Sequence, residues 1–150
     1  MMQLSKEIKT SKFENPFQQA LVNLIFTYHW SSQQVKDVLT PFDITQQQYN
    51  VMRILRGQYP SPSTINLIKS RILDKMSDTS RIVDRLIQKG YVEKSTNNYD
   101  KRAVDIIISD KGLSLLKKMD KEVDFSKFIA PNISSQEAEQ LNILLDKMRG

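Results

Sequence analysis

The sequence predicts a mainly helical α+β fold in which one β-hairpin interrupts a series of helices. Three observations predict it: apolar residues recur at spacings of three and four over most of the chain, the period changes to two after Gly90, and glycine and proline are scarce, with 4 and 5 in 150 residues. A chain of this length can bury one hydrophobic core, so we expect residues 1–150 to form a single protomer.

The charge and the rare residue types restrict the function. The 22 lysines and arginines exceed the 17 acidic residues, and the formal net charge of +5 favours a polyanionic partner without identifying one. Without cysteine and with His29 as the single histidine, the chain lacks the residues for a disulfide scaffold or a His/Cys metal cluster, so we expect no metal and no cofactor. No apolar run is long enough for a signal peptide or a membrane span, which predicts a cytoplasmic protein with no membrane partner.

The first predicted helix covers residues 13–39. Its apolar stripe consists of Phe13, Phe17, Ala20, Leu21, Leu24, Ile25, Tyr28, Val35, Val38 and Leu39. At 1.5 Å per residue this helix would be about 40 Å long, more than a small domain covers by itself, so we expect part of it to contact a second subunit. Pro41 is expected to end it.

A short helix is predicted to begin after Thr45. Thr45 and Gln48 have the spacing of a capping box, and Ile44 is placed to pack against Tyr49. Gly57 is the expected C-cap.

A second short helix is expected after two prolines, with Ser61 or Ser63 as its N-cap, and it contains Ile65, Ile68 and Ile72. The next helix is expected to be capped by Asp74 or Ser77 and to stop at Gly90. Its predicted inner face consists of Thr79, Ile82, Val83 and Leu86. Two short helices with a tight connection are typical of a helix-turn-helix.

A β-hairpin is predicted over residues 91–108, with a polar turn at 96–102. Ser109 is expected to begin a further helix, and Ser134 with Glu137 forms a predicted capping box for the last one. A helix, a glycine stop, a strand, a basic turn and a second strand, in that order, predict a winged helix-turn-helix.

Two groups of cations are candidates for DNA contact. Arg81 and Arg85 lie one turn apart on the outward face of their helix, which consists of Ser77, Asp78, Arg81, Asp84, Arg85 and Gln88. An arginine in the major groove can donate two hydrogen bonds to guanine O6 and N7, and Lys101 and Arg102 on the hairpin turn could enter a minor groove. The alternatives are a solvated helix face with Arg–Asp pairs and an ordinary polar turn.

Residues 73–92 resemble the MarR-family pattern of a recognition helix that ends in a basic residue and glycine. Asp100-Lys101-Arg102 matches the wing signature of that family, and residues 109–112 stand in place of its usual Thr-x-x-Gly. Thr79 departs from the pattern, where an aliphatic residue is commoner, and residues 71–76 lack the usual glycine. The resemblance covers nearly the whole chain.

The resemblance implies a homodimeric regulator of transcription that binds double-stranded DNA, a repressor acting on a pseudo-palindromic operator. It places the DNA-binding lobe at residues 41–109 and the dimerisation region at 1–40 and 110–150, a region formed by the long N-terminal helix and two C-terminal helices. The implied DNA contacts are Ser77, Asp78, Ser80, Arg81, Arg85, Lys101 and Arg102, with Asp100 steadying the wing.

Members of this family often bind a small aromatic effector, and here the residues that could line such a site are Tyr28, His29, Trp30, Phe42 and Met52. The alternative for these five residues is packing in the core and the dimer interface. No motif for catalysis is present, such as HExxH, GxSxG or a glycine-rich phosphate loop, so an enzyme is not expected. The other possibilities are a winged-helix module that binds protein without specific DNA contact and a small-molecule-binding accessory of an enzyme.

Overall fold

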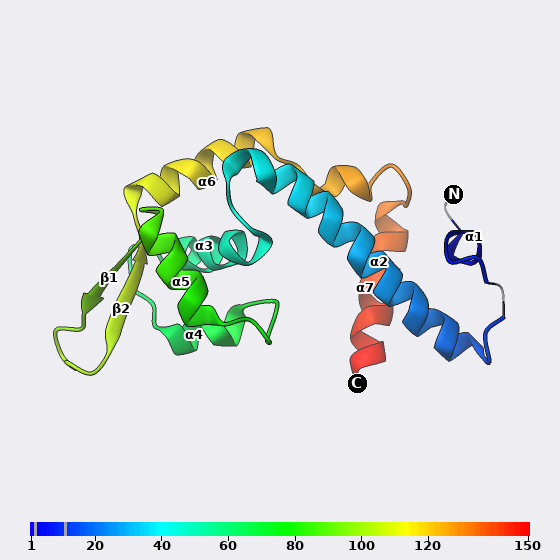
Figure 1. Cartoon of the computed structure of the whole chain (residues 1–150), viewed down its shortest axis with the longest axis horizontal. Coiled ribbons are helices and arrows are strands. Elements are labelled where there is room, and N and C mark those ends of the chain that lie inside the picture. Colours follow the sequence, from blue (N-terminus) through cyan, green and yellow to red (C-terminus); the bar gives the residue numbers. More distant parts are fainter. Residues whose placement is uncertain (2, 11) are drawn as a thin grey trace. The chain divides into compact units, whose positions relative to one another are not determined.

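A computed structural model describes residues 1, 3–10 and 12–150. The predicted fold class is confirmed, because helices dominate and the described residues contain one two-stranded antiparallel sheet (Figure 1). The α-helices are α1 (Leu4–Glu7), α2 (Pro16–Leu39), α3 (Gln46–Gln58), α4 (Ile65–Arg71), α5 (Thr79–Gln88), α6 (Asp110–Glu122) and α7 (Ser135–Arg149), the 3-10 segments are η1 (Thr40–Phe42) and η2 (Phe125–Phe128), and the strands are β1 (Val92–Thr96) and β2 (Val104–Ile108).

The chain forms two compact units, which we describe separately. The first, residues 39–124, we call the winged-helix lobe, and the second, residues 1–38 with 125–150, we call the terminal unit. In the lobe α3 contacts α4, α5, α6 and β2, while α5 also contacts α4 and β1. All the buried hydrophobic residues of the described chain belong to the lobe: Leu39, Ile44, Val51, Met52, Leu55, Ile68, Ile72, Val83, Leu86, Val92, Ile106, Ile108, Leu116 and Met119.

The hairpin is anchored on both edges of β2. On one edge β1 pairs with it in the register Val92 opposite Ile108 and Thr96 opposite Val104. On the other edge Ile106 exchanges two backbone hydrogen bonds with Ser63, at 2.7 and 2.9 Å. The wing is therefore attached to the loop before α4 as well as to its own hairpin partner.

The N-cap expected for α4 is wrong. Thr64, not Ser61 or Ser63, caps the helix, and its side chain accepts a hydrogen bond of 3.2 Å from the backbone N–H of Leu67. Ser63 is only 2% exposed and its backbone is held by β2, so it lies one position too early to cap.

The N-cap expected for α5 is also wrong, because Asp78 caps this helix by accepting the backbone N–H of Arg81 at 3.1 Å. Asp74 instead closes a local turn, where its carboxylate accepts from the N–H of Met76. The predicted stop at Gly90 is confirmed, since Gly90 has φ of 76°, a left-handed conformation that glycine adopts without strain.

The capping box of α3 is confirmed, with reciprocal 3.1 Å hydrogen bonds between Thr45 and Gln48. Gly57 does not end this helix as expected. The helix runs on to Gln58, and the N–H of Tyr59 bonds to carbonyls of the last turn.

The helix after the hairpin begins as predicted, with Ser109 accepting the N–H of Gly112 at 3.1 Å. Leu116 and Met119 of this helix, α6, are buried in the core of the lobe. The compact lobe therefore extends to Asp124, beyond the boundary expected at residue 109.

The terminal unit contains α1, α2, η2 and α7. Helix α2 begins at Pro16, three residues later than expected, and the side chain of Asn15 accepts the N–H of Gln18 at 2.9 Å. Its predicted end before Pro41 is confirmed. Among the described residues of this unit no hydrophobic side chain is fully buried, and none of the described helices is long and apolar enough to cross a membrane.

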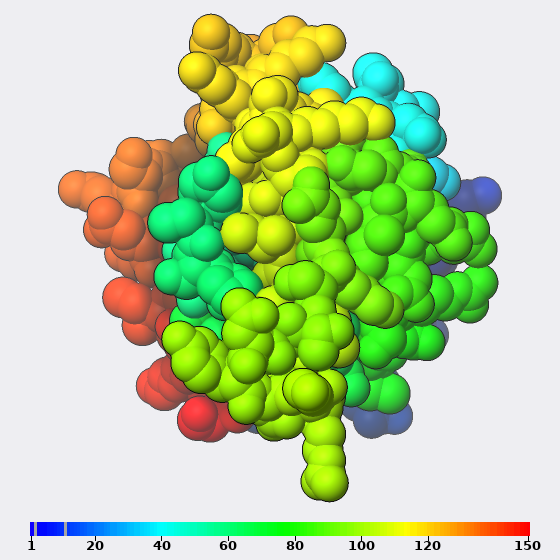
Figure 2. All heavy atoms as spheres, turned by 90° about the vertical axis from the view of Figure 1, so that its left-hand side faces the viewer, coloured from blue at the N-terminus to red at the C-terminus, as the bar shows by residue number. Residues whose placement is uncertain are grey.

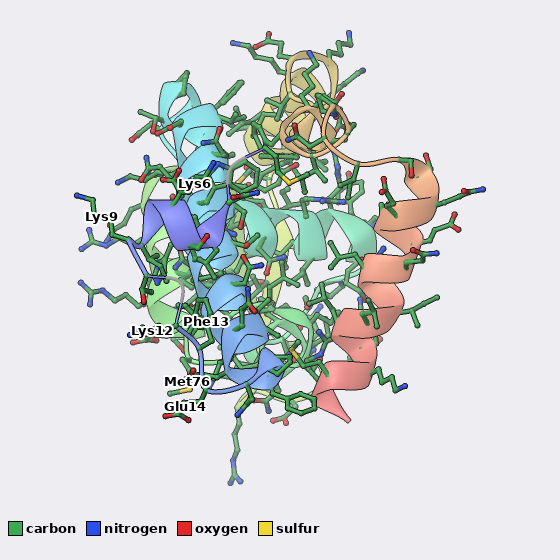
Figure 3. The ribbon with its side chains drawn as sticks, turned by 90° about the vertical axis from the view of Figure 1, so that its right-hand side faces the viewer. Lys6, Lys9, Lys12, Phe13, Glu14 and Met76 are labelled. Carbon is green, nitrogen blue, oxygen red and sulfur yellow. The ribbon has the colours of Figure 1, made fainter. Side chains whose placement is uncertain are left out.

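Two further features of the terminal unit lie at the start of α7 and in the N-terminal segment. The predicted capping box of Ser134 and Glu137 is present at α7. Hydrogen bonds from the backbone and the hydroxyl of Ser134 hold the pKa of Glu137 below its ordinary value. The exposed lysines Lys6, Lys9 and Lys12 follow one another along the N-terminal segment (Figure 3).

Candidate nucleic-acid interface

The outward face of α5 carries the two arginines that the sequence singled out. Val83 and Leu86 are buried on the inner face, so a helix of 3.6 residues per turn directs Arg81 and Arg85 to the opposite side, where both are exposed. Ser80 is exposed on the same helix. Figure 2 shows the face of the lobe with α5 in green and the wing in yellow-green, projecting at the bottom of the view.

The guanidinium groups of this face are not engaged in ion pairs with any residue that the structure describes. Arg85 donates a 3.4 Å hydrogen bond to Gln88, a neutral partner. Asp84 pairs instead with Lys94 of β1, with 3.8 Å between Nζ and Oδ1, which ties the helix to the wing. The Arg–Asp pairs of the alternative interpretation are thus absent from the described part of α5, and both guanidinium groups can meet an external anion.

A shallow pocket of about 260 Å³ opens beside this face. It is lined by Thr45, Gln47, Gln48, Asp74, Ser77, Asp78, Arg81, Ile82 and Arg85. The hydroxyl oxygen of Ser77 is buried and has no hydrogen-bond partner among the described residues, while Asp78 uses its carboxylate as the helix cap. The predicted DNA contacts of Ser77 and Asp78 would therefore need a change of rotamer or a contact from another atom of each residue.

The tip of the wing is held by hydrogen bonds from two side chains. Asn97 Oδ1 accepts the N–H groups of Tyr99 and Asp100, at 2.8 and 2.9 Å. Asp100 Oδ1 accepts the N–H of Arg102 at 2.9 Å, which is the geometry expected of a residue that steadies the turn. Lys101 and Arg102 are both exposed at this tip.

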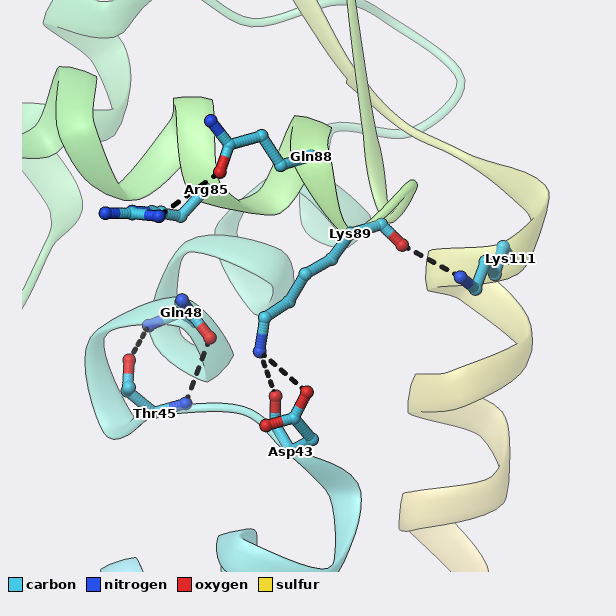
Figure 4. A network of polar contacts seen from close by, with 7 residues as sticks. All are labelled: Asp43, Thr45, Gln48, Arg85, Gln88, Lys89 and Lys111. Atoms are coloured by element: carbon cyan, nitrogen blue, oxygen red, sulfur yellow. Dashed lines mark hydrogen bonds and ion pairs between the residues drawn. The ribbon is translucent and has the colours of Figure 1, made fainter.

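A network that the sequence analysis did not anticipate supports the C-terminal end of α5 (Figure 4). The ammonium group of Lys89 donates to the backbone carbonyl of Asp43 and lies 3.2 Å from its carboxylate. The Nζ of Lys111 donates to the carbonyl of Lys89 at 2.8 Å and lies 4.9 Å from the ring centroid of Tyr91. These contacts fix the end of α5 to the loop before α3 and to the start of α6.

A second long-range contact joins α3 and α6. The guanidinium of Arg56 makes two hydrogen bonds to the carboxylate of Asp120, at 2.7 and 3.2 Å. Its partner lies 64 positions away in the sequence, so no local pattern could indicate it. This contact holds α6 against α3, the helix that also packs against α5.

The five residues expected to line an effector site divide between the two units. In the terminal unit the rings of Tyr28 and His29 meet edge to face with centroids 5.4 Å apart, and Trp30 is half-buried. In the lobe Phe42 lies under the ammonium of Lys118 and Met52 is fully buried in the core. Their grouping around an effector stays a prediction.

Comparison with known proteins connects this geometry to a family. Residues 44–104 match the model of the MarR family. The multiple antibiotic resistance protein MarR of Escherichia coli (strain K12) is 28% identical over 117 residues, which cover 76% of this chain and 79% of that protein.

Two solved structures have the same fold. A mutant of Escherichia coli MarR complexed with operator DNA has a TM-score of 0.75 at 24% identity, with 98% of this chain and 99% of that chain covered. Bordetella bronchiseptica BpsR, from a study of how 6-hydroxynicotinic acid regulates its DNA binding, has a TM-score of 0.76 at 18% identity, with coverages of 92% and 98%. The matched segment contains α5, the hairpin's first strand and the wing tip, so residues 44–104 resemble the MarR family, and the chain is similar in sequence and fold to MarR-family transcription regulators.

Proposed function

We propose that this protein is a repressor that binds double-stranded DNA as a homodimer at a pseudo-palindromic operator. Each protomer inserts α5 into a major groove and its wing into the adjacent minor groove, and the two recognition helices enter successive major grooves one helical turn apart. The bound dimer occludes the promoter. A small aromatic effector that changes the spacing of the two lobes lowers the affinity, because only one spacing fits both half-sites.

The observation that carries this proposal is the pair of exposed guanidinium groups on α5, free of ion pairs with any described residue. An arginine with five donors and no internal carboxylate partner is suited to bidentate recognition of guanine. Arg102, on a tip whose backbone is fixed by Asp100, is the matching contact for the minor groove. The solved complex of a MarR mutant with operator DNA supports the same use of this fold here.

The homodimer is supported by the apolar side chains that α2 and α7 leave exposed. On α2 they are Phe17, Leu21, Leu24, Ile25 and Tyr28, and on α7 they are Leu141, Ile143, Leu144 and Met148. Soluble monomers rarely expose so many large apolar residues on two helices. A second copy of the chain presents the same stripes and can cover them.

The effector is supported more indirectly. BpsR, which shares the fold, is regulated in its DNA binding by 6-hydroxynicotinic acid, a small aromatic acid. In this chain the adjoining rings of Tyr28 and His29 offer aromatic surface and a ring nitrogen to such a ligand, and Trp30 is the next residue of the helix.

The test is a fluorescence anisotropy titration of the purified protein against DNA from its own upstream region, repeated over a series of salt concentrations. Arg81→Ala is expected to weaken specific binding by about 1 to 3 kcal/mol, and Arg102→Ala is expected to weaken it and to reduce the salt slope by about 1 for each wing. The matched control is Lys117→Ala, which removes one exposed cation from α6 and should leave the affinity almost unchanged.

The outcomes separate the two main hypotheses. Binding with the stoichiometry of a dimer that both arginine variants weaken supports the repressor. Absent binding, or binding to any sequence that neither variant changes, contradicts it and favours the protein-interaction module.

A further inference from the structure

Tyr99 is the most exposed aromatic side chain of the described chain, at 99%. It lies on the tip of the wing, between Asn98 and the Asp100–Arg102 turn. Its side chain makes no hydrogen bond or ring contact with any residue that the structure describes. A tyrosine carries a large apolar ring that gains free energy when it is covered and a hydroxyl that can donate a hydrogen bond, so an exposed tyrosine is suited to contact a partner.

The position of Tyr99 is fixed by its neighbours. Asn97 Oδ1 accepts its backbone N–H at 2.8 Å, and Asn97 Nδ2 donates at 2.9 Å to Asp105 of β2. The N–H of Asn97 bonds to the carbonyl of Ala103 across the turn at 3.1 Å. The phenol is therefore displayed from a braced tip and not from a loose loop.

The chemistry around Tyr99 identifies the kind of partner. Lys101 and Arg102, both exposed, follow it within three residues, and no carboxylate pairs with either of them among the described residues. The carboxylate of Asp100 is turned to the backbone of Arg102. A tip with two cations and one phenol suits a surface that alternates phosphate oxygens with apolar sugar, which is the edge of the minor groove in duplex DNA.

We propose that Tyr99 is a further DNA-contact residue, whose ring packs on a deoxyribose at the rim of the minor groove while its hydroxyl donates a hydrogen bond to a phosphate oxygen. This inference rests on the proposed function and adds a contact that carries no net charge. Arg102 enters the groove, and Tyr99 fixes the depth and angle of the wing on the backbone beside it. Since phosphates and sugars are the same at every base pair, the contact contributes affinity and not sequence preference.

The experiment measures Kd and its salt dependence for Tyr99→Phe and Tyr99→Ala against the same upstream duplex. Losing one hydrogen bond to a charged group should raise Kd about tenfold or more in Tyr99→Phe, and losing the ring as well should raise it further in Tyr99→Ala. Because the contact is not ionic, the slope of log Kd against log salt should equal that of the wild type, whereas Arg102→Ala lowers it by about 1 for each wing.

Asn98→Ala is the matched control, since Asn98 is the exposed neighbour of Tyr99 and makes no side-chain hydrogen bond to a described residue. Its Kd should stay within about twofold of the wild type, as expected for a surface substitution away from a contact. Thermal unfolding of each variant checks the fold, and no change is expected because the Tyr99 side chain makes no hydrogen bond or ring contact with the residues that the structure describes.

The results distinguish this inference from the proposed function. If the wild type binds and Tyr99→Ala binds equally well, the inference is overturned while the repressor stands. A lowered salt slope in Tyr99→Ala would also overturn it, because the substitution would then have displaced the cations. If the wild type binds no duplex, the proposed function itself fails.

Discussion

The two units of this chain have similar helical patterns and opposite states of burial. In the winged-helix lobe α3 packs against α5, α6 and β2, and α5 packs against β1; all the buried hydrophobic residues of the described chain lie in this lobe. In the terminal unit Phe17 is 86% exposed and Ile143 is 65% exposed. The lobe therefore has a buried core of its own, whereas the terminal unit leaves large apolar side chains exposed.

This difference shows what an amphipathic stripe does and does not specify. Spacings of three and four predict a helix with one apolar face, and both α2 and α5 have such a face. The pattern does not state whether the covering residues come from the same chain or from another. On the proposed function, the lobe binds DNA and the terminal unit joins two lobes.

The largest effect is expected from a charge placed on the exposed apolar face of the terminal unit. Ile25→Asp on α2 and Leu144→Asp on α7 should dissociate the dimer, because a carboxylate would be desolvated in the interface. Loss of the second lobe should weaken operator binding about a hundredfold or more, since the two half-sites are then no longer bound together. Sedimentation velocity measures the oligomeric state and anisotropy the affinity.

Leu73→Asp is the control for these variants. Leu73 is 79% exposed but lies in the winged-helix lobe, so the same substitution there should leave the sedimentation coefficient of the dimer unchanged. A wild-type chain that sediments as a monomer would contradict the interpretation of the terminal unit.

Substitutions at two glycines test whether the lobe is closely packed. A Cβ on Gly112 would lie 2.4 Å from the carbonyl oxygen of Tyr91 and 2.8 Å from a side-chain carbon of Ile108, so Gly112→Ala should reduce the free energy of unfolding by about 1 to 3 kcal/mol. Gly57, inside α3, has nothing within 4 Å of that position. Gly57→Ala should therefore stabilise the protein by about 0.5 to 1 kcal/mol.

Urea denaturation of both variants gives these free energies. Equal changes in the free energy of unfolding for Gly112→Ala and Gly57→Ala would contradict the close approach of Gly112 to Tyr91 and Ile108.

A smaller effect is expected when the hydrogen bonds of Asn97 at the wing tip are removed. Asn97→Ala removes the acceptor for two backbone N–H groups and the donor to Asp105, so the tip should become mobile. Operator affinity should fall by about 1 kcal/mol, because ordering the tip then has to be driven by binding, while the thermal stability of the lobe changes little. Amide hydrogen exchange at residues 99–102 should speed up, and unchanged exchange would show that the side chain of Asn97 does not hold the turn.

The smallest predicted effect concerns pH and the start of α7. The pKa of Glu137 is lowered by its hydrogen bonds to the backbone and hydroxyl of Ser134, so the folded chain binds this proton more weakly than the unfolded chain does. The capping box consequently contributes stability above the ordinary pKa of glutamate and loses it as the pH falls through the lowered value. Glu137→Gln should have a slightly lower Tm than the wild type at pH 7, and the difference should shrink as the pH falls below the ordinary pKa of glutamate. A difference that does not change with pH would assign the effect to packing.

Most of the fold could be predicted from the sequence because its signals are local. The Thr45–Gln48 capping box, Gly90 and the change of period at the hairpin each specify a structure within a few residues. The outward directions of Arg81 and Arg85 follow from the inner face of the same helix.

The remaining features depend on contacts between distant residues. Serine is a residue type that commonly caps helices, but the backbone of Ser63 pairs with Ile106, 43 positions later in the sequence. Thr64 is therefore the N-cap of α4. Lys89 and Asp43 lie 46 positions apart and no periodicity connects them. The end of the lobe at Asp124 also could not be predicted from the sequence, because the amphipathic pattern of α6 does not indicate which helix it packs against.

The measurement that tests the central claim most directly is methylation protection of guanine N7 on the upstream duplex, because N7 lies in the major groove where Arg81 is expected to donate. The account predicts two clusters of protected guanines about 10 base pairs apart, with protection lost in Arg81→Ala and retained in Lys117→Ala. Protection that persists in Arg81→Ala, or a bound complex with no protected guanine, would contradict the placement of α5 in the major groove.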